Sequence, residues 1–121
     1  MNKKQNSKQY DLEDRTLKFA QRTRAFIKEL PKTISNIEDS KQLNKASGSV
    51  GANYIEANES ISKKDFVYRI KVCRKEVKES RYFLKLIDID TIIHLEQVKE
   101  ELIKEATELM NIFGSIIRKT E

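Results

Sequence analysis

Four segments of this sequence carry apolar residues at intervals of three or four positions, and this spacing is the feature that most restricts the fold. The segments cover residues 12–30, 36–61, 63–87 and 91–119. Short connections join them, and helices joined in this way pack as antiparallel neighbours. The chain has only three Gly and one Pro, too few for the turns of an all-β fold. We therefore expect an all-α, antiparallel up-down-up-down four-helix bundle over residues 11–121, after a disordered polar tail at residues 1–10.

Polar residues and the single proline mark the expected ends of these helices. Pro31 cannot continue a helix and ends the first segment. Ser35 or Asn36 is the expected N-terminal cap of the second helix. Ser62 and Asp90 are the expected caps of the third and fourth helices. The apolar stripes that should form the core include Leu17, Ile37 and Ile61.

The stretch KASGSVGANY, residues 45–54, is unusual because it gathers small residues in a chain of bulky and charged ones. It lacks the lysine that a phosphate-binding P-loop needs after its second glycine. It contains a GSVG string like the clamp of KH domains, but that clamp needs a sheet beside it and no strand is expected here. The apolar stripe continues through the stretch, which disfavours a linker and indicates the interior of a helix.

Glycine in a helix interior costs about 1 kcal/mol relative to alanine, so a compensating gain is needed. Gly48, Gly51 and Ala52 would form a flat face that lets a neighbouring helix approach closely. Asn53 and Glu56 would then lie beside the core stripe, partly buried and in need of hydrogen-bonding partners. We therefore expect close helix packing at these five positions.

The third segment carries the strongest functional signal, in a chain with a net charge of +5. A nearly pure basic face, flanked by Tyr68 and Tyr82, recurs there at steps of three and four: Lys71, Arg74, Lys78, Arg81 and Lys85. Cations at this spacing can follow the phosphates of a nucleic acid. A solvated face, or a face paired with the acids of a neighbouring subunit, is the alternative interpretation.

The last two segments are apolar on more than one side, which a four-helix protomer of this size does not require. The surplus residues are Val72, Phe83, Leu86, Ile103, Met110 and Ile117. They predict an interface between copies of the chain. A broad core within one protomer is the alternative.

The strings GSVGANYIEAN, SKKDF, KEVKESRYFLKL and IFGSII resemble the bacterial four-helix-bundle family known as 23S rRNA intervening sequence proteins. That family is similar in turn to the accessory protein of diversity-generating retroelements. The resemblance covers roughly residues 14–119, with a central Ser-Val-x-Ala-Asn-x-x-Glu-Ala motif at residues 49–57. Lys45 and Ala46 stand where members usually have Arg-Ser. The resemblance implies a small four-helix protomer, often assembled as a ring of five, with no enzymatic activity. It also implies a retroelement relative that works with nucleic acid and a reverse transcriptase.

Residue types that carry catalysis or metal chemistry are sparse and scattered. His94 is the only histidine and lies near the start of the fourth segment. Cys73 falls on the core stripe of the third segment and should be a small buried hydrophobe. The carboxylates are dispersed among basic residues and do not form a metal-ligand pattern. We expect no catalytic residue, no cofactor, no metal and no small-molecule substrate.

These observations predict a non-catalytic oligomeric accessory protein that binds the backbone of RNA or DNA through basic helical surfaces. The expected partners are further copies of the chain, in a ring of five as the resemblance implies, and a nucleic acid or a protein that handles one. The lone cysteine fits the reducing cytoplasm, and no apolar run is long enough to cross a membrane. The alternative is a protein–protein scaffold whose charges serve self-assembly, without binding of nucleic acid.

Overall fold

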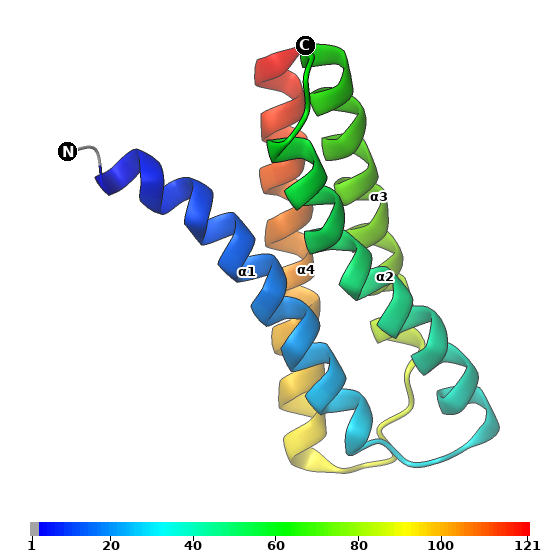
Figure 1. Cartoon of the computed structure of the whole chain (residues 1–121). Helices are drawn as coiled ribbons and strands as arrows, with labels where there is room; N and C mark the ends of the chain where they lie inside the picture. The colour runs from blue at the N-terminus through cyan, green and yellow to red at the C-terminus, as the bar shows by residue number, and fades with distance from the viewer. Residues whose placement is uncertain (1–2) are drawn as a thin grey trace.

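Four antiparallel helices make up the described part of the protein, residues 3–121, as the computed structural model shows (Figure 1). The structure describes the backbone of residues 3–121 and the side chains of residues 12–121. The helices are α1 (Lys3–Lys28), α2 (Ile34–Asn58), α3 (Lys63–Leu86) and α4 (Ile93–Thr120). No strand occurs between residues 3 and 121. The all-α, up-down-up-down fold expected from the apolar spacing is confirmed.

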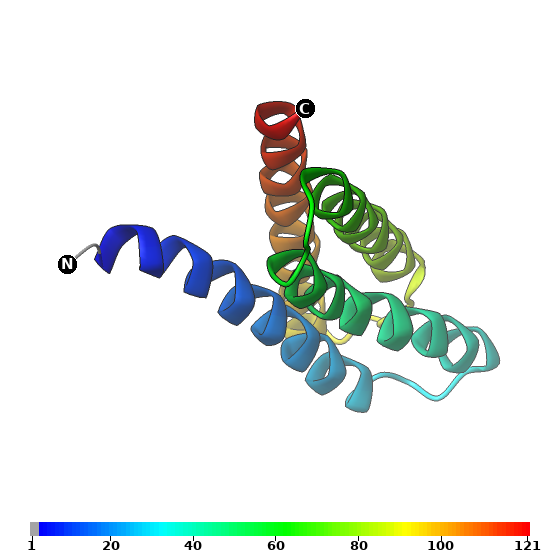
Figure 2. The ribbon, with the colours of Figure 1, turned by 45° about the horizontal axis from the view of Figure 1, so that its top comes forward.

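Each helix packs on its neighbours in a closed order around the core. The α2–α3 and α3–α4 contacts are the most extensive, and α1 packs less closely on α2 and α4 (Figure 2). Among the described residues, no Cα of α1 lies within 8 Å of α3, and none of α2 within 8 Å of α4. The two basic helices, α1 and α3, are therefore diagonal and do not share a face.

The first helix begins earlier than the sequence indicated. We expected a disordered tail at residues 1–10 and a helix from about residue 12, whereas α1 starts at Lys3. Residues 1 and 2 of that expected tail lie outside the described residues. Neither Gly nor Pro occurs before Pro31, so no residue type in this segment opposes a helix.

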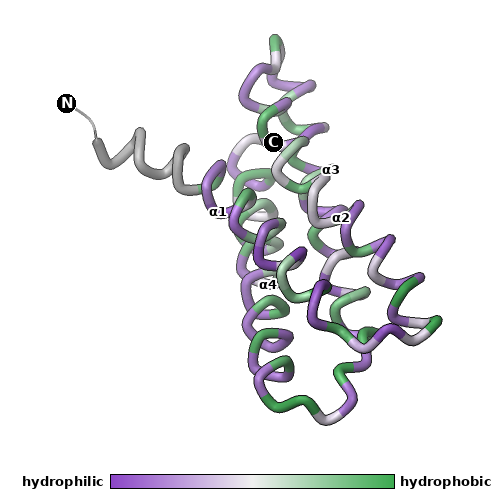
Figure 3. The backbone as a smooth tube through the Cα atoms, turned by 60° about the horizontal axis from the view of Figure 1, so that its bottom comes forward, coloured by the Kyte–Doolittle hydropathy of each residue, from purple (hydrophilic) through white to green (hydrophobic). Residues whose placement is uncertain are grey.

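The buried face of α1 differs in phase from the expected stripe. It is formed by Thr16, Phe19, Thr23 and Phe26, and Leu30, just beyond the end of the helix, is also buried. Leu17 is 54% exposed instead, and Ile37 and Ile61 of the expected stripes are 42% and 95% exposed. The hydroxyl of Thr16 donates to the Leu12 carbonyl at 2.8 Å, so its polar atom is satisfied inside the bundle. Along α4, by contrast, hydrophobic positions recur turn by turn as the pattern predicts (Figure 3).

The N-terminal cap expected from the sequence is found in α3 but not in α2. The Ser62 hydroxyl accepts from the Asp65 amide at 3.0 Å, so the predicted cap of α3 is confirmed. The cap of α2 is Thr33, whose side chain accepts from the Asn36 amide at 3.1 Å. The expected caps Ser35 and Asn36 are wrong, because both already lie inside the first turn of α2.

Asn36 is buried and joins two connections at the same end of the bundle. Its side-chain amide donates to the Pro31 carbonyl at 3.0 Å and to the Asp88 carbonyl at 2.7 Å. Its oxygen accepts from the Asp88 amide at 3.0 Å. Asp90 and Thr91, which follow, have positive φ angles of 57° and 67°. Asp90 is therefore a turn residue, the expected cap there is wrong, and α4 begins at Ile93.

The small-residue stretch lies in the interior of α2, where Gly51 faces α1. A Cβ added at Gly51 would be 2.9 Å from the Thr16 Oγ1 and 3.2 Å from the Thr16 Cβ. At Gly48 it would meet only the mobile end of the Arg24 side chain, at 3.0 Å. The two helix backbones therefore approach closely at Gly51 and less so at Gly48.

The polar side chains of this stretch divide between two environments. Asn53 is half-buried, donates to the Ser49 carbonyl at 2.9 Å and accepts from Arg69 at 2.9 Å. Ala52 and Glu56 are exposed. The prediction that these two residues take part in the close helix packing is therefore wrong. They are four residues apart, so they lie on the same face of α2, and that face is turned to solvent.

Candidate nucleic-acid interface

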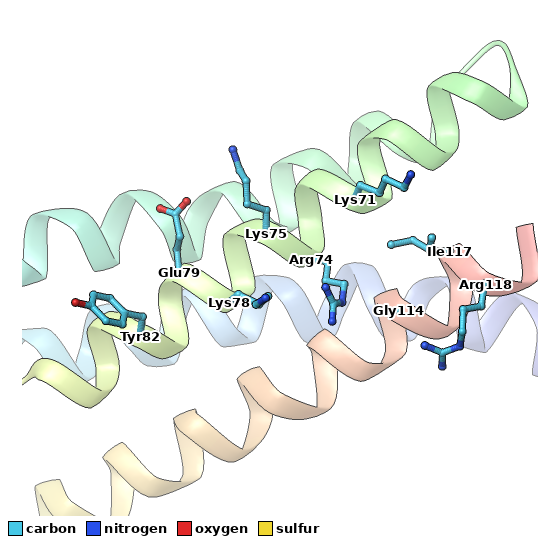
Figure 4. Close-up of a pocket in the computed structure, with 9 residues that line it drawn as sticks. All are labelled: Lys71, Arg74, Lys75, Lys78, Glu79, Tyr82, Gly114, Ile117 and Arg118. Atoms are coloured by element: carbon cyan, nitrogen blue, oxygen red, sulfur yellow. The ribbon is translucent and has the colours of Figure 1, made fainter. Parts of the chain in front are cut away.

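A surface groove runs between α3 and α4, and we call it the α3–α4 groove. Its main part has a volume of about 670 Å³ (Figure 4) and is lined by Lys71, Arg74, Lys75, Lys78, Glu79, Tyr82, Gly114, Ile117 and Arg118. An adjoining hollow of about 250 Å³ is lined by Lys78, Arg81, Tyr82, Lys85 and Met110. The structure thus brings all five predicted nucleic-acid-binding residues to one groove.

The period of α3 places these cations beside the core. The buried residues of α3 are Ile70, Cys73, Val77, Ser80 and Leu84. Each cation of the basic face follows one of them by a single position. One position turns a side chain by about 100° around the helix axis. The cations therefore form a stripe parallel to the core stripe, on the side of α3 that borders α4.

Most cations of the groove lack an acidic partner. Lys71 is paired with the Glu121 carboxylate at 2.9 Å. Among the side chains of residues 12–121, no carboxylate forms an ion pair with Arg74, Lys78, Arg81, Lys85 or Arg118. Arg81 instead contacts the Met110 sulfur at 3.9 Å. The groove therefore carries a local excess of positive charge.

Two cations of α1, by contrast, are paired with carboxylates of α4. Arg15 donates to Glu105 at 2.7 and 3.0 Å and to Glu108 at 3.3 Å. Arg22 donates to Glu101 at 3.2 Å. The acids of α4 that could compensate basic residues thus face α1. This leaves the α3 side of the bundle without the pairing that alternating helix charges would otherwise provide.

Two arginines converge where α4 has a glycine. A Cβ added at Gly114 would lie 3.4 Å from the Arg74 Nε and 3.4 Å from an Arg118 terminal nitrogen. These two nitrogens are therefore no more than 6.8 Å apart. Figure 4 shows Arg74 extending from α3 toward α4, whereas Lys75 and Glu79 extend away from α4. The sequence analysis missed Arg118 and Gly114, although their spacing of four places them on one face of a helix.

Two equally exposed tyrosines flank the basic face, and their surroundings differ. Tyr82 is 60% exposed at the rim of the groove, with its ring centroid 5.3 Å from that of Phe83 in an edge-to-face arrangement. Tyr68 is also 60% exposed, but the Arg69 guanidinium lies over its ring at 5.7 Å. Tyr82 therefore has a supported ring beside the groove.

The six residues predicted for an oligomer interface do not form one exposed patch. Phe83, Ile103, Met110 and Ile117 are partly buried and pack against the core. Val72 is half-buried, and Leu86 is 46% exposed. Met110 and Ile117 also line the α3–α4 groove. A second copy that used these two residues would cover the same cations.

Other reactive side chains lie outside this groove. Burial raises the pKa of Cys73 to about 12, so its thiol is protonated at neutral pH. His94 is exposed, with its Nε2 2.9 Å from a Glu29 carboxylate oxygen. Within the described part of the chain, no three His, Cys, Asp or Glu side chains gather as a metal ion requires. None of the described helices is apolar over a length that spans a bilayer.

Comparisons with known proteins agree with the fold. The family model of the 23S rRNA-intervening sequence protein matches residues 8–115. A crystal structure of a protein of unknown function from Bacteroides thetaiotaomicron, of the S23 ribosomal protein family, is 30% identical with a TM-score of 0.74. That match covers 88% of this chain and 97% of the other. Among curated proteins, none matches the chain.

Proposed function

We propose that this chain, which belongs to the 23S rRNA-intervening sequence protein family, is a non-catalytic accessory protein that binds the backbone of RNA or DNA in the α3–α4 groove. The observation that carries the proposal is the set of groove cations without carboxylate partners, while Arg15 and Arg22 of α1 are paired with acids of α4. Phosphates would supply the missing anions, and cations that neutralise them release bound counterions.

The geometry of the groove supports contacts with consecutive phosphates. Cations three or four residues apart recur about every 5 Å along a helix. Arg74 and Arg81 are half-buried, and a charge-assisted hydrogen bond gains strength where water is partly excluded. No feature of the groove reads base edges, so we expect little sequence preference.

The proposal extends to assembly and location. The resemblance to the family implies a homo-oligomer, for which a ring of five is the expected form. Val72, Phe83 and Leu86 remain candidates for that interface, because they do not line the α3–α4 groove that holds the cations. The cytoplasm is the proposed location, since the unpaired thiol of Cys73 stays reduced there.

A protein–protein scaffold is the second candidate function. The observation that favours it is the apolar floor that Met110 and Ile117 contribute to the groove. Under this function an acidic surface of another copy would cover the cations, and the groove would be closed to nucleic acid.

Binding of structured RNA and of duplex DNA across a salt series tests the proposal. Affinity should fall steeply with salt, by about 0.9 units of log–log slope for each phosphate contact on a duplex. The triple variant Arg74→Glu, Lys78→Glu, Arg81→Glu should abolish binding and keep its helix content. A matched control, Lys28→Glu, Lys32→Glu, Lys104→Glu, makes the same charge change at exposed sites outside the groove and should retain most of the affinity.

Two outcomes would contradict the proposal. Binding that survives in the groove variant would place the contact elsewhere, with α1 as the next surface to test. A parent protein that binds no nucleic acid at about 0.15 M salt, and whose groove variant loses its oligomeric state, would establish the scaffold instead.

A further inference from the structure

The convergence of Arg74 and Arg118 over Gly114 creates a place for one anion. Two guanidinium groups repel each other when their nitrogens are no more than 6.8 Å apart, and no carboxylate of residues 12–121 is paired with either. A phosphate between them would relieve this repulsion, because guanidinium groups match phosphate oxygens in charge and geometry. Gly114 is buried beneath the two arginine side chains, and its lack of a side chain lets both lie close to the α4 backbone.

The ring of Tyr82 provides a flat apolar surface further along the same groove. Phe83 supports it edge-on and is itself packed against the core, so the ring is held in place. An exposed aromatic ring beside cations is the arrangement on which unpaired bases stack. A base inside a duplex has neighbours on both faces and cannot use such a ring.

The distances along α3 fit a short stretch of one strand. Tyr82 follows Arg74 by eight positions, which corresponds to about 12 Å along a helix. Lys78 lies between them and borders both parts of the groove. The main volume of about 670 Å³ is that of a small-molecule site, enough for one or two nucleotide units.

We propose that the α3–α4 groove binds an unpaired strand in preference to a duplex, with one phosphate between Arg74 and Arg118 and a base stacked on Tyr82. This inference rests on the proposed function and names the form of nucleic acid that the groove takes. Stacking is tolerant of base identity, so the preference concerns strandedness and not sequence.

Fluorescence anisotropy with an unstructured RNA of about 12 nucleotides and with the corresponding RNA duplex tests this. The single strand should bind about tenfold more tightly than the duplex, and Tyr82→Ala should remove that advantage. Tyr82→Phe should keep it. Tyr68→Ala, which removes the equally exposed tyrosine on the other flank of the basic face, should leave the preference for the single strand in place. Arg118→Gln should lower the single-strand salt slope by about 0.7.

The outcomes separate this inference from the proposed function. Equal affinity for the two forms, or a Tyr82→Ala variant that keeps the single-strand preference, would overturn the inference and leave backbone binding in the groove intact. An unchanged salt slope in Arg118→Gln would overturn the phosphate position. Absence of binding to either RNA and to the DNA strand and duplex of the same sequence would overturn the proposed function itself. Circular dichroism of each variant would establish that it is folded.

Discussion

Replacing each of two glycines in α2 by alanine separates helix propensity from helix packing. Both substitutions gain about 1 kcal/mol because alanine favours the helix. At Gly51 the new Cβ would be 2.9 Å from the Thr16 Oγ1 and 3.2 Å from the Thr16 Cβ. Thr16 is buried and its hydroxyl is bonded to the Leu12 carbonyl, so it has little room to move.

The expected energies follow from these contacts. Overpacking of a well-packed site costs about 1–3 kcal/mol, so Gly51→Ala should be destabilised by up to about 2 kcal/mol after the helical gain. At Gly48 the obstruction is the end of the Arg24 side chain, which can rotate away. Gly48→Ala should therefore be as stable as the parent or more stable by about 1 kcal/mol. Gly51→Leu should cost several kcal/mol, about 3 or more, because the longer side chain cannot be accommodated.

Urea denaturation followed by circular dichroism measures these free energies of unfolding. The difference between the two alanine variants should be about 1–3 kcal/mol and is independent of helix propensity, which both share. In the Gly51→Ala background, Thr16→Ala should cost less than it does alone, since it also relieves the contact. Equal stability of Gly48→Ala and Gly51→Ala, or a Gly51→Leu variant as stable as the parent, would refute close helix approach at Gly51.

Three further predictions concern other buried polar groups. Asn36→Ala should lower the free energy of unfolding by about 2–3 kcal/mol in a urea titration, because it leaves the Asp88 amide and two carbonyls without their partner. An unchanged urea midpoint would show that these hydrogen bonds do not stabilise the two connections. The pKa of Glu76 is raised, first by burial and then by Glu79, so its contribution to stability is present below its unfolded pKa and is lost as the pH rises through its folded pKa. Glu76→Gln should thus stabilise the protein at pH 7 and have no effect in acid. Thermal melts at the two pH values test this, and a variant that melts below the parent at pH 7 would contradict it. With a pKa of about 12, the Cys73 thiol should react with a disulfide reagent at pH 8 only in denaturant, and rapid labelling of the native protein would contradict its burial.

The fold and the basic face were predicted correctly from the sequence because both depend only on the spacing of residues along a helix. The cations of α3 follow the core stripe by one position each, so the helical repeat was enough to align them. The phase of α1 was wrong because Thr16 and Thr23 count as polar in an apolar pattern, yet both are buried. The Thr16 hydroxyl bonds within its own helix, whereas the Thr23 hydroxyl has no partner among the described residues. The start of α4 was wrong because Asp90 and Thr91 adopt positive φ beside the connection that Asn36 holds.

Parts of the candidate site depend on how two helices meet, which a single sequence does not encode locally. Gly114 and Arg118 gain their place only because α4 lies antiparallel to α3 and brings them opposite Arg74. The acids of α4 could have paired with either neighbour by charge alone. Their engagement with Arg15 and Arg22 of α1 leaves Arg74, Lys78, Arg81 and Lys85 of α3 without an acidic partner among the described side chains.

Cross-linking of a photoreactive single-stranded RNA to the parent protein, with the modified residues identified by mass spectrometry, tests the central claim most directly. We expect cross-links in the α3–α4 groove, foremost at Tyr82, that disappear as salt weakens binding. Cross-links confined to α1, or none at a salt concentration where RNA is bound, would contradict the groove as the site of contact.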